Sequence, residues 1–300
     1  MRYKITHTTH YRYAQPVGLY PHSLRLCPRS DGAQWLQSFD LSYSSTPTKD
    51  ISFLDAYGNI CNKVTFLQSV SELKIQSVSD VRTTRTNPFD YLSEPWAVQL
   101  PIDYPISVVT QLSPYLTAPI SNIATAPSVI HLAASLVAES SGNISDFLLR
   151  LTQLIPNMCT YQQRLEGDAY APGVTLEKKS GTCRDFTVLF MAICRTVGLA
   201  ARFVSGYQEG DLNHQHDLHA WAEVYLPGGG WRGFDPTLGL AVGDRHVAIA
   251  AALNPKHAAP VTGILKTTTP VQTQLTTNIS IEAIEQRPLD SRPTHFQSQS

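Results

Sequence analysis

The stretch SGTCRDFTVLFMAICRTVG, residues 180–198, decides how the rest of the chain is interpreted. Its apolar residues recur three and four positions apart, as the buried face of an amphipathic helix requires. Thr182 can cap this helix, with Asp185 three residues on as a short variant of the capping box, and Gly198 can end it. The pattern therefore predicts a buried helix whose first turn carries Cys183.

Cys183 stands at the predicted start of this helix, where two properties of a helix N-terminus favour a thiolate. Backbone N–H groups there lack partners within the helix, and the helix dipole places partial positive charge near the sulfur. Gly181 leaves the approach to the sulfur open. The alternative is a small buried cysteine, which is common in proteins. The choice depends on whether the chain supplies a base.

A base and an orienting group follow in DLHAWAEVYLPGGGWRGFDPT, residues 217–237. If residues 218–226 form a strand, His219 lies at its start on the less apolar face. A turn at the three glycines would pair this strand with the next one, which ends at Asp235. Cysteine on a helix end, with histidine and aspartate on adjacent strands, is the arrangement of cysteine acyl transfer.

Each of these residues also has an ordinary structural interpretation. Cys183 alone could be core, His219 a half-buried polar residue, and Asp235 a turn residue before proline. The functional interpretation is favoured because all three residue types occur together, each on the element that its role requires.

The whole chain of 300 residues is long enough for two domains. Residues 1–90 alternate as short strands and predict an antiparallel β-rich domain. Residues 91–126 are rich in proline and predict a linker with docked turns. Residues 127–266 give helices and then an antiparallel meander, which predicts an α+β catalytic domain. Residues 267–300 are polar and predict a disordered tail.

Composition narrows the partners and the compartment. The net charge of −1 gives no reason to expect nucleic acid or a membrane as a partner. The N-terminus lacks the apolar segment of a signal peptide, and no run approaches 18 apolar residues. The five cysteines are odd in number and include no CxxC, so we expect reduced thiols and a cytoplasmic protein.

The segment HQHDLH, residues 214–219, raises a metal alternative because imidazole is a ligand for zinc, copper and nickel. Its spacing fits no familiar zinc motif, and no glutamate follows as in HExxH. We therefore expect His214 and His216 to lie in an exposed loop that borders the substrate cleft. A histidine-loop metalloenzyme remains as an alternative.

Together, GTCRDF, ARFVSGY and LHAWAEVYLPGGGWRGFDPT resemble the transglutaminase-like superfamily. The likeness is greatest to bacterial proteins labelled as cysteine proteases, which carry a β-rich N-terminal domain. YKITHTTHYRY resembles the opening of that domain, and residues 259–263 resemble the closing segment of the family. The resemblance covers roughly residues 1–266. The segment LNPKHAAPVTG departs from the family pattern, so no substrate contact is transferred through it.

The resemblance implies a papain-like, transglutaminase-like catalytic core that follows the antiparallel β domain. It makes Cys183 the nucleophile, His219 the general base and then acid, and Asp235 the group that orients the imidazole. The substrate would be an amide in a protein or peptide, and no metal or organic cofactor takes part. The expected function is amide hydrolysis, as in a peptidase, through an acyl-enzyme. Protein-glutamine acyl transfer and a non-catalytic binding module are the alternatives.

Two features stay open at this point. The backbone N–H of Cys183 is the natural first donor of an oxyanion hole. The second donor could come from Tyr161, Gln162 or Gln163, and the sequence does not choose among them. The oligomeric state is not indicated by the sequence either.

Overall fold

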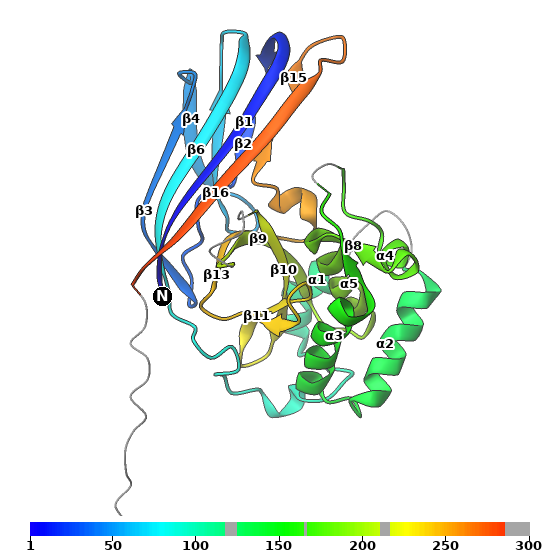
Figure 1. Cartoon of the computed structure of the whole chain (residues 1–300). Helices are drawn as coiled ribbons and strands as arrows, with labels where there is room; N and C mark the ends of the chain where they lie inside the picture. The colour runs from blue at the N-terminus through cyan, green and yellow to red at the C-terminus, as the bar shows by residue number, and fades with distance from the viewer. Residues whose placement is uncertain (118–124, 165–166, 211–216, 286–300) are drawn as a thin grey trace, which may run out of the picture.

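The computed structural model describes residues 1–117, 125–164, 167–210 and 217–285. It is an α+β fold with antiparallel sheets, as the sequence predicts: a β lobe stands beside a core in which helices cover one face of a sheet (Figure 1). None of the described helices is long and apolar enough to cross a lipid bilayer.

The β lobe consists of two antiparallel sheets. In the first sheet, β1 lies between β6 on one side and β15 and β16 on the other, and β3 forms the edge beyond β6. The second sheet has the order β14-β2-β5-β4. The first sheet contains β1 (Arg2–Leu19), β3 (Gln34–Tyr43), β6 (Val70–Thr83), β15 (Leu265–Lys266) and β16 (Thr273–Glu285), and the second contains β2 (His22–Leu24), β4 (Lys49–Leu54), β5 (Ile60–Thr65) and β14 (Val261–Thr262).

The C-terminal strand β16 corrects the expectation of a disordered tail over residues 267–300. It runs antiparallel to β1 and pairs with it from Arg2 to Tyr13 (Figure 1). Its sequence alternates, so Ile279 and Ile281 are buried while polar neighbours face outward. The β lobe therefore uses both ends of the chain rather than residues 1–90 alone. Residues 286–300 lie outside the described part.

The proline-rich segment 91–126 also contains more structure than a linker. It holds a short 3-10 helix, η1 (Pro95–Ala97), and the helix α1 (Ile106–Thr117). Leu112 is buried in a cluster with Tyr104 and Ala200, so α1 is packed against the core. Pro114 inside α1 interrupts the helical pattern that sequence reasoning depends on.

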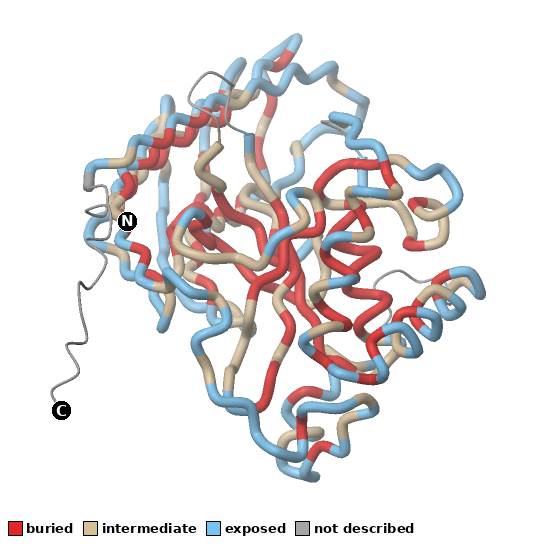
Figure 2. The backbone as a smooth tube through the Cα atoms, turned by 60° about the horizontal axis from the view of Figure 1, so that its bottom comes forward, coloured by how far each residue is buried: buried red, intermediate tan, exposed pale blue. Residues whose placement is uncertain are grey.

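The core places one buried helix against a five-stranded antiparallel sheet of order β12-β11-β10-β9-β13. Almost all of α5 is buried, with α2, α3 and α4 around it (Figure 2). The helices are α2 (Pro127–Glu139), α3 (Ile144–Met158), α4 (Pro172–Lys178) and α5 (Cys183–Thr196), followed by η2 (Pro255–Ala258), and the strands are β9 (Ala201–Gln208), β10 (His219–Leu226), β11 (Gly230–Asp235), β12 (Leu240–Ala241) and β13 (His246–Ala252), with a short parallel pair of β7 (Thr160–Tyr161) and β8 (Ser180–Gly181).

The hairpin of β10 and β11 has the predicted glycine turn. Leu226 pairs with Gly230, and Gly228 adopts a positive φ of 83°. A Cβ at Gly228 would also lie 2.0 Å from the Leu92 carbonyl oxygen, so the turn and the close approach of residue 92 both require glycine.

Two side-chain amides join the β lobe to the core. Each amide forms the pair of hydrogen bonds with the backbone of β13 that a neighbouring strand would form. The Gln34 side chain donates to the Ala248 carbonyl at 2.8 Å and accepts from the Ala248 N–H at 2.7 Å. Asn59 forms the same pair with Ala251, at 2.9 and 2.8 Å. Two buried amides therefore pair with the backbone of Ala248 and Ala251 on the side of β13 that faces the lobe.

Replacing Ile279 tests whether β16 is an integral strand. We expect Ile279→Ala to lower the free energy of unfolding by about 2–4 kcal/mol, because it leaves a cavity in a packed core. Leu275→Ala on the same strand should cost less than about 1 kcal/mol, because Leu275 is 48% exposed. Urea unfolding measures both. Equal, small effects would show that β16 does not contribute to the core.

Candidate active site

The start of α5 is fixed by a buried capping box. Thr182 is the N-cap, and its backbone N–H donates to the Asp185 carboxylate at 2.7 Å. The same carboxylate accepts from Arg164 Nη2 at 2.8 Å and from the Tyr170 N–H at 2.6 Å. A Cβ at Gly181 would lie 2.8 Å from the Asp185 Cβ, so glycine is needed beside the box. The cap predicted from the sequence is therefore present.

Cys183 is the first residue of α5 and is 7% exposed. Its sulfur is close enough to His219 to influence the imidazole, as described below. The other four cysteines are also free and buried. Burial raises the pKa of the Cys27 and Cys61 thiols to about 11 and raises that of Cys194 further. These thiols therefore stay protonated at neutral pH.

The β10–β11 hairpin brings His219 and Asp235 together, as expected. Ala222 pairs with Phe234, which sets Asp235 diagonally across from His219. The distance from His219 Nε2 to Asp235 Oδ2 is 2.7 Å. The Nδ1 side of the ring is thus left for Cys183. The three residues predicted from the sequence lie in one site, contributed by a helix end and two strands.

Asp235 is completely buried, and donors surround both of its oxygens. Oδ1 accepts from the backbone N–H groups of Thr237 and Leu238, at 2.9 and 3.1 Å. Oδ2 accepts from His219 and also from His246 Nε2, at 3.0 Å. Burial favours the neutral acid, yet His219 and these hydrogen bonds hold the pKa of Asp235 below its usual range. Asp235 is therefore a carboxylate that only accepts hydrogen bonds.

The charge of Asp235 decides the protonation of His219. Burial alone would lower the pKa of His219, but the Asp235 carboxylate and, to a smaller degree, the Cys183 sulfur raise it to about 10. His219 is thus an imidazolium at neutral pH, with one N–H directed to Asp235. The site holds a cation between the carboxylate and the cysteine sulfur.

His246, at the start of β13, is a site residue that sequence reasoning missed. It is 5% exposed, and burial lowers its pKa, so the ring is neutral. Because Asp235 can only accept, Nε2 of His246 carries the proton and Nδ1 has a lone pair. The only sign in the sequence is one histidine at the head of the apolar run HVAIAAA, which by itself does not point to Asp235.

The ring of Trp221 packs beside both histidines. Its centroid lies 6.3 Å from that of His219 and 5.2 Å from that of His246. Gly206 makes this possible, because a Cβ there would lie 2.5 Å from the indole ring. Trp221 is 1% exposed, so it packs behind the site and does not form an open wall of a cleft.

The strand pair β7–β8 places the candidate second oxyanion donors next to α5. Gln163 donates to Asp217 at 2.8 Å, so its amide is already engaged. The Gln162 backbone N–H donates to the Gly181 carbonyl at 2.8 Å. Tyr161 is half exposed, and burial together with the nearby Cys183 sulfur raises the pKa of its hydroxyl. Of the three candidates, Tyr161 is the one whose hydroxyl lies close enough to the Cys183 sulfur for the sulfur to raise its pKa.

Among the described residues, one cluster of side chains could hold a metal ion. The ligand atoms of His219, Asp235 and His246 lie within 4.8 Å of one another. In the present arrangement Nε2 of each imidazole is engaged with the carboxylate, so a metal bound through these nitrogens would displace both hydrogen bonds. His214 and His216, which raise the metal alternative in the sequence, lie outside the described residues.

Asp235→Asn tests the electrostatic origin of the His219 charge. Without the carboxylate, burial dominates, and we expect the pKa of His219 to fall from about 10 to below its ordinary value of about 6.5. NMR titration of the histidine ring protons measures the change. His7, whose pKa burial lowers to about 4, lies in the β lobe and should titrate unchanged. An unaltered His219 titration would refute the assigned cause.

Comparison with other proteins agrees with this organisation. Residues 3–82 match the bacterial transglutaminase-like N-terminal region, and residues 130–236 match the transglutaminase-like superfamily. An uncharacterized protein of Mycobacterium tuberculosis is 28% identical over 281 residues, which cover 89% of this chain and 88% of the relative. A protein-glutamine gamma-glutamyltransferase of Pseudomonas aeruginosa is 38% identical over 73 residues, which are 22% of this chain and 11% of that protein.

A solved structure from Cytophaga hutchinsonii, described as a "Putative Cysteine Protease", shares the fold with a TM-score of 0.72. It is 19% identical, and the match covers 96% of this chain and 92% of that one. The agreement extends over both the β lobe and the core. The chain therefore belongs to the transglutaminase-like superfamily and carries the bacterial N-terminal region of that superfamily ahead of its core.

Proposed function

We propose that this protein is a cysteine-dependent amide hydrolase, a peptidase that works through Cys183, His219 and Asp235. The observation that carries the proposal is the 2.7 Å contact of His219 with a buried carboxylate, beside a cysteine at a helix N-terminus. A nucleophile, a base and an orienting group in this order are what cysteine acyl transfer needs.

The first half of the reaction forms an acyl-enzyme. The Cys183 sulfur attacks the carbonyl carbon of an amide, and the carbonyl oxygen becomes an oxyanion. The backbone N–H of Cys183 and the Tyr161 hydroxyl are the donors proposed for that charge. The His219 imidazolium gives its proton to the nitrogen that departs, so an amine or ammonia leaves and a thioester remains. Asp235 keeps the ring oriented throughout.

The second half returns the enzyme to its starting state. Neutral His219 takes a proton from water, and the resulting hydroxide attacks the thioester carbon. The carboxylic acid product leaves, the sulfur regains its charge and His219 is again an imidazolium. An imidazolium at His219 is thus the resting state, which agrees with the raised pKa of this residue.

Protein-glutamine acyl transfer is the second candidate, in which an amine replaces water. The match of 73 residues to a protein-glutamine gamma-glutamyltransferase favours it. Hydrolysis takes first place because nothing in the described site is dedicated to an amine. We further propose that the substrate is a protein or peptide and that the protein acts in the cytoplasm.

The partition between water and amine tests the proposal directly. We expect casein, incubated with the protein and a fluorescent primary amine, to yield new peptide termini or ammonia faster than it gains label. Cys183→Ala should abolish both reactions, whereas Cys27→Ala should leave them unchanged, because Cys27 is buried in the β lobe. Mass spectrometry and an ammonia assay measure the products. Label that outpaces release would establish the transferase instead, and no reaction on any amide would favour a binding module.

His246→Ala tests whether His246 positions Asp235. We expect the rate of Cys183 alkylation by iodoacetamide at neutral pH to fall by about tenfold, the scale of one hydrogen bond to a charged group. His246→Gln keeps an N–H donor of similar reach and should recover most of the rate. His10→Ala, which removes a half-buried histidine of the β lobe paired with Glu72, is the matched control. Equal rates in all variants would remove His246 from the site.

A further inference from the structure

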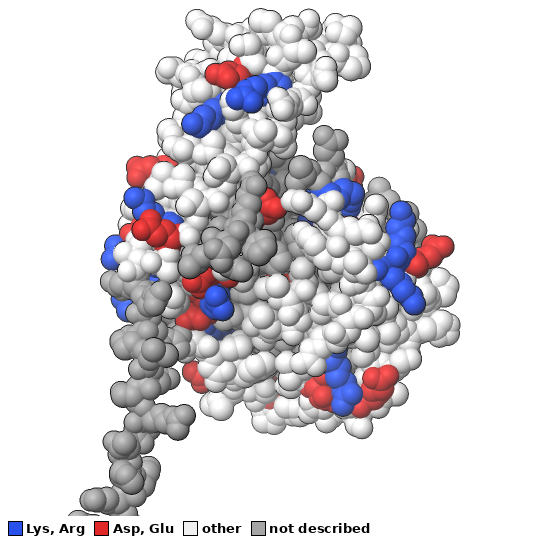
Figure 3. All heavy atoms as spheres, viewed as in Figure 1, with Lys and Arg blue, Asp and Glu red and all other residues white. Residues whose placement is uncertain are grey.

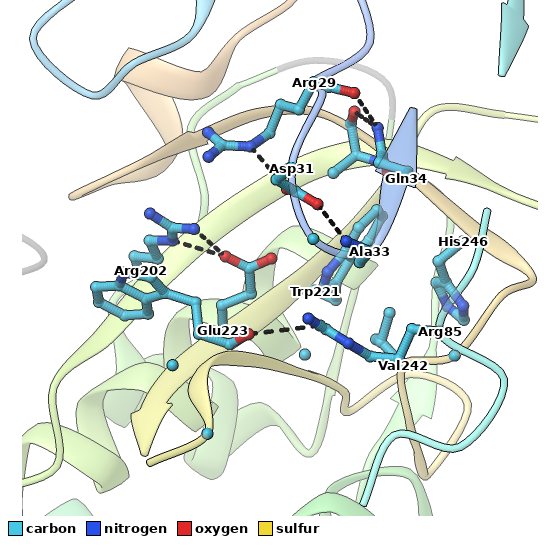
Figure 4. Close-up of a pocket in the computed structure, with 17 residues that line it drawn as sticks. Arg29, Asp31, Ala33, Gln34, Arg85, Arg202, Trp221, Glu223, Val242 and His246 are labelled. Atoms are coloured by element: carbon cyan, nitrogen blue, oxygen red, sulfur yellow. Dashed lines mark hydrogen bonds and ion pairs between the residues drawn. The ribbon is translucent and has the colours of Figure 1, made fainter. Parts of the chain in front are cut away.

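A cavity of about 300 Å³ lies between the β lobe and the core sheet, on the face of the sheet turned away from α5 (Figure 4). The lobe contributes Arg29 and Asp31, and the sheet contributes Trp221 and Glu223. On β10 these two residues alternate with Ala220 and Ala222, which pack in the core cluster of α5. The volume is at the lower end of the range for small-molecule sites.

The arginines that line this cavity outnumber its carboxylates by one. Asp31 pairs with Arg29 at 3.6 Å, and Glu223 accepts from Arg202 Nε at 2.6 Å. Among the described residues, the guanidinium of Arg85 forms one hydrogen bond, to the Trp231 carbonyl oxygen at 3.5 Å (Figure 4). Within residues 1–117, 125–164, 167–210 and 217–285, no carboxylate forms an ion pair with Arg85. The lining therefore has an unmatched positive charge.

Two buried donors at the same cavity also lack acceptors. Trp221 is 1% exposed, and its Nε1–H has no hydrogen-bond partner among the described protein groups. Arg29 Nε is also buried and forms no hydrogen bond, since the carboxylate oxygen of its ion-pair partner Asp31 lies 3.6 Å away. Native proteins rarely leave buried donors unpaired, because each forfeits its bonds to water. The cavity lining is therefore short of both hydrogen-bond acceptors and negative charge.

We propose that this cavity binds a small organic monocarboxylate. A carboxylate supplies one negative charge and two acceptor oxygens, which suits the planar guanidinium of Arg85 and the indole N–H of Trp221. The Trp221 and Trp231 rings and Val242, which line the same space, suit a short aliphatic chain. Inorganic phosphate shares the acceptor chemistry but cannot fill the apolar part.

This site is separate from the proposed reaction. It lies on the lobe side of the sheet and needs neither Cys183 nor an acyl-enzyme. It adjoins the triad at one residue, because His246 lines the cavity and also donates to Asp235. Binding can therefore be measured on the resting protein, and its failure would leave the hydrolase proposal untouched.

The test is a titration of the full chain, labelled with ¹⁵N at the tryptophan indoles, with butyrate. We expect the Trp221 indole resonance, assigned by Trp221→Phe, to shift in a saturable manner. Butyramide, which has the same shape without the charge, should cause no saturable shift, and phosphate should bind more weakly than butyrate.

Arg85→Gln supplies the decisive variant. It should weaken butyrate binding at least tenfold, since a hydrogen bond to a charged group is lost. Arg82→Gln removes an exposed arginine outside the cavity and should bind as the native protein does. Unmoved resonances of Trp35 and Trp96, which lie outside the cavity lining, would show that both variants are folded. The proposal would be overturned if butyrate did not shift the Trp221 resonance, or if it shifted this resonance equally in the native protein and in Arg85→Gln.

Discussion

The buried carboxylate of Asp185 is the constraint on which the position of the nucleophile depends. It gathers the N-cap N–H of Thr182, the guanidinium of Arg164 and the backbone N–H of Tyr170 at one point. A fully buried charge is stable only when such donors surround it. These hydrogen bonds hold the start of α5 against the chain before it and so fix the position of Cys183.

A second buried carboxylate, Asp235, meets the same requirement with a different result. One of its donors is the imidazole of His219, which can carry a positive charge. The protonated ring stabilises the Asp235 carboxylate, and the carboxylate in turn raises the pKa of His219. His246 donates to the same oxygen, Asp235 Oδ2, and stays neutral because burial lowers its pKa. The two histidines on this oxygen thus differ in charge. Asp235 and, to a smaller degree, the Cys183 sulfur raise the pKa of His219, whereas burial and the nearby charges of His219 and Arg245 lower the pKa of His246.

Local patterns carried the prediction of α5, its cap and the glycine hairpin, because each depends on neighbours within a few residues. The position of Asp235 followed from that hairpin, whose register is set by its own turn. His246 and β16 could not be found this way, since their roles depend on partners 11 residues away and at the opposite end of the chain. A Thr-rich strand paired at an edge has the composition of a disordered tail, and only β1 makes it a strand.

The surface agrees with the low charge of the sequence: acidic and basic side chains form small mixed groups on the face drawn in Figure 3. Buried side-chain amides join the β lobe to the core. Gln34 and Asn59 hold β13, the strand that begins with His246. Because His246 holds Asp235, and Asp235 sets the charge of His219, a chain of direct contacts leads from the lobe to the cysteine. The N-terminal region is thus part of the site's support.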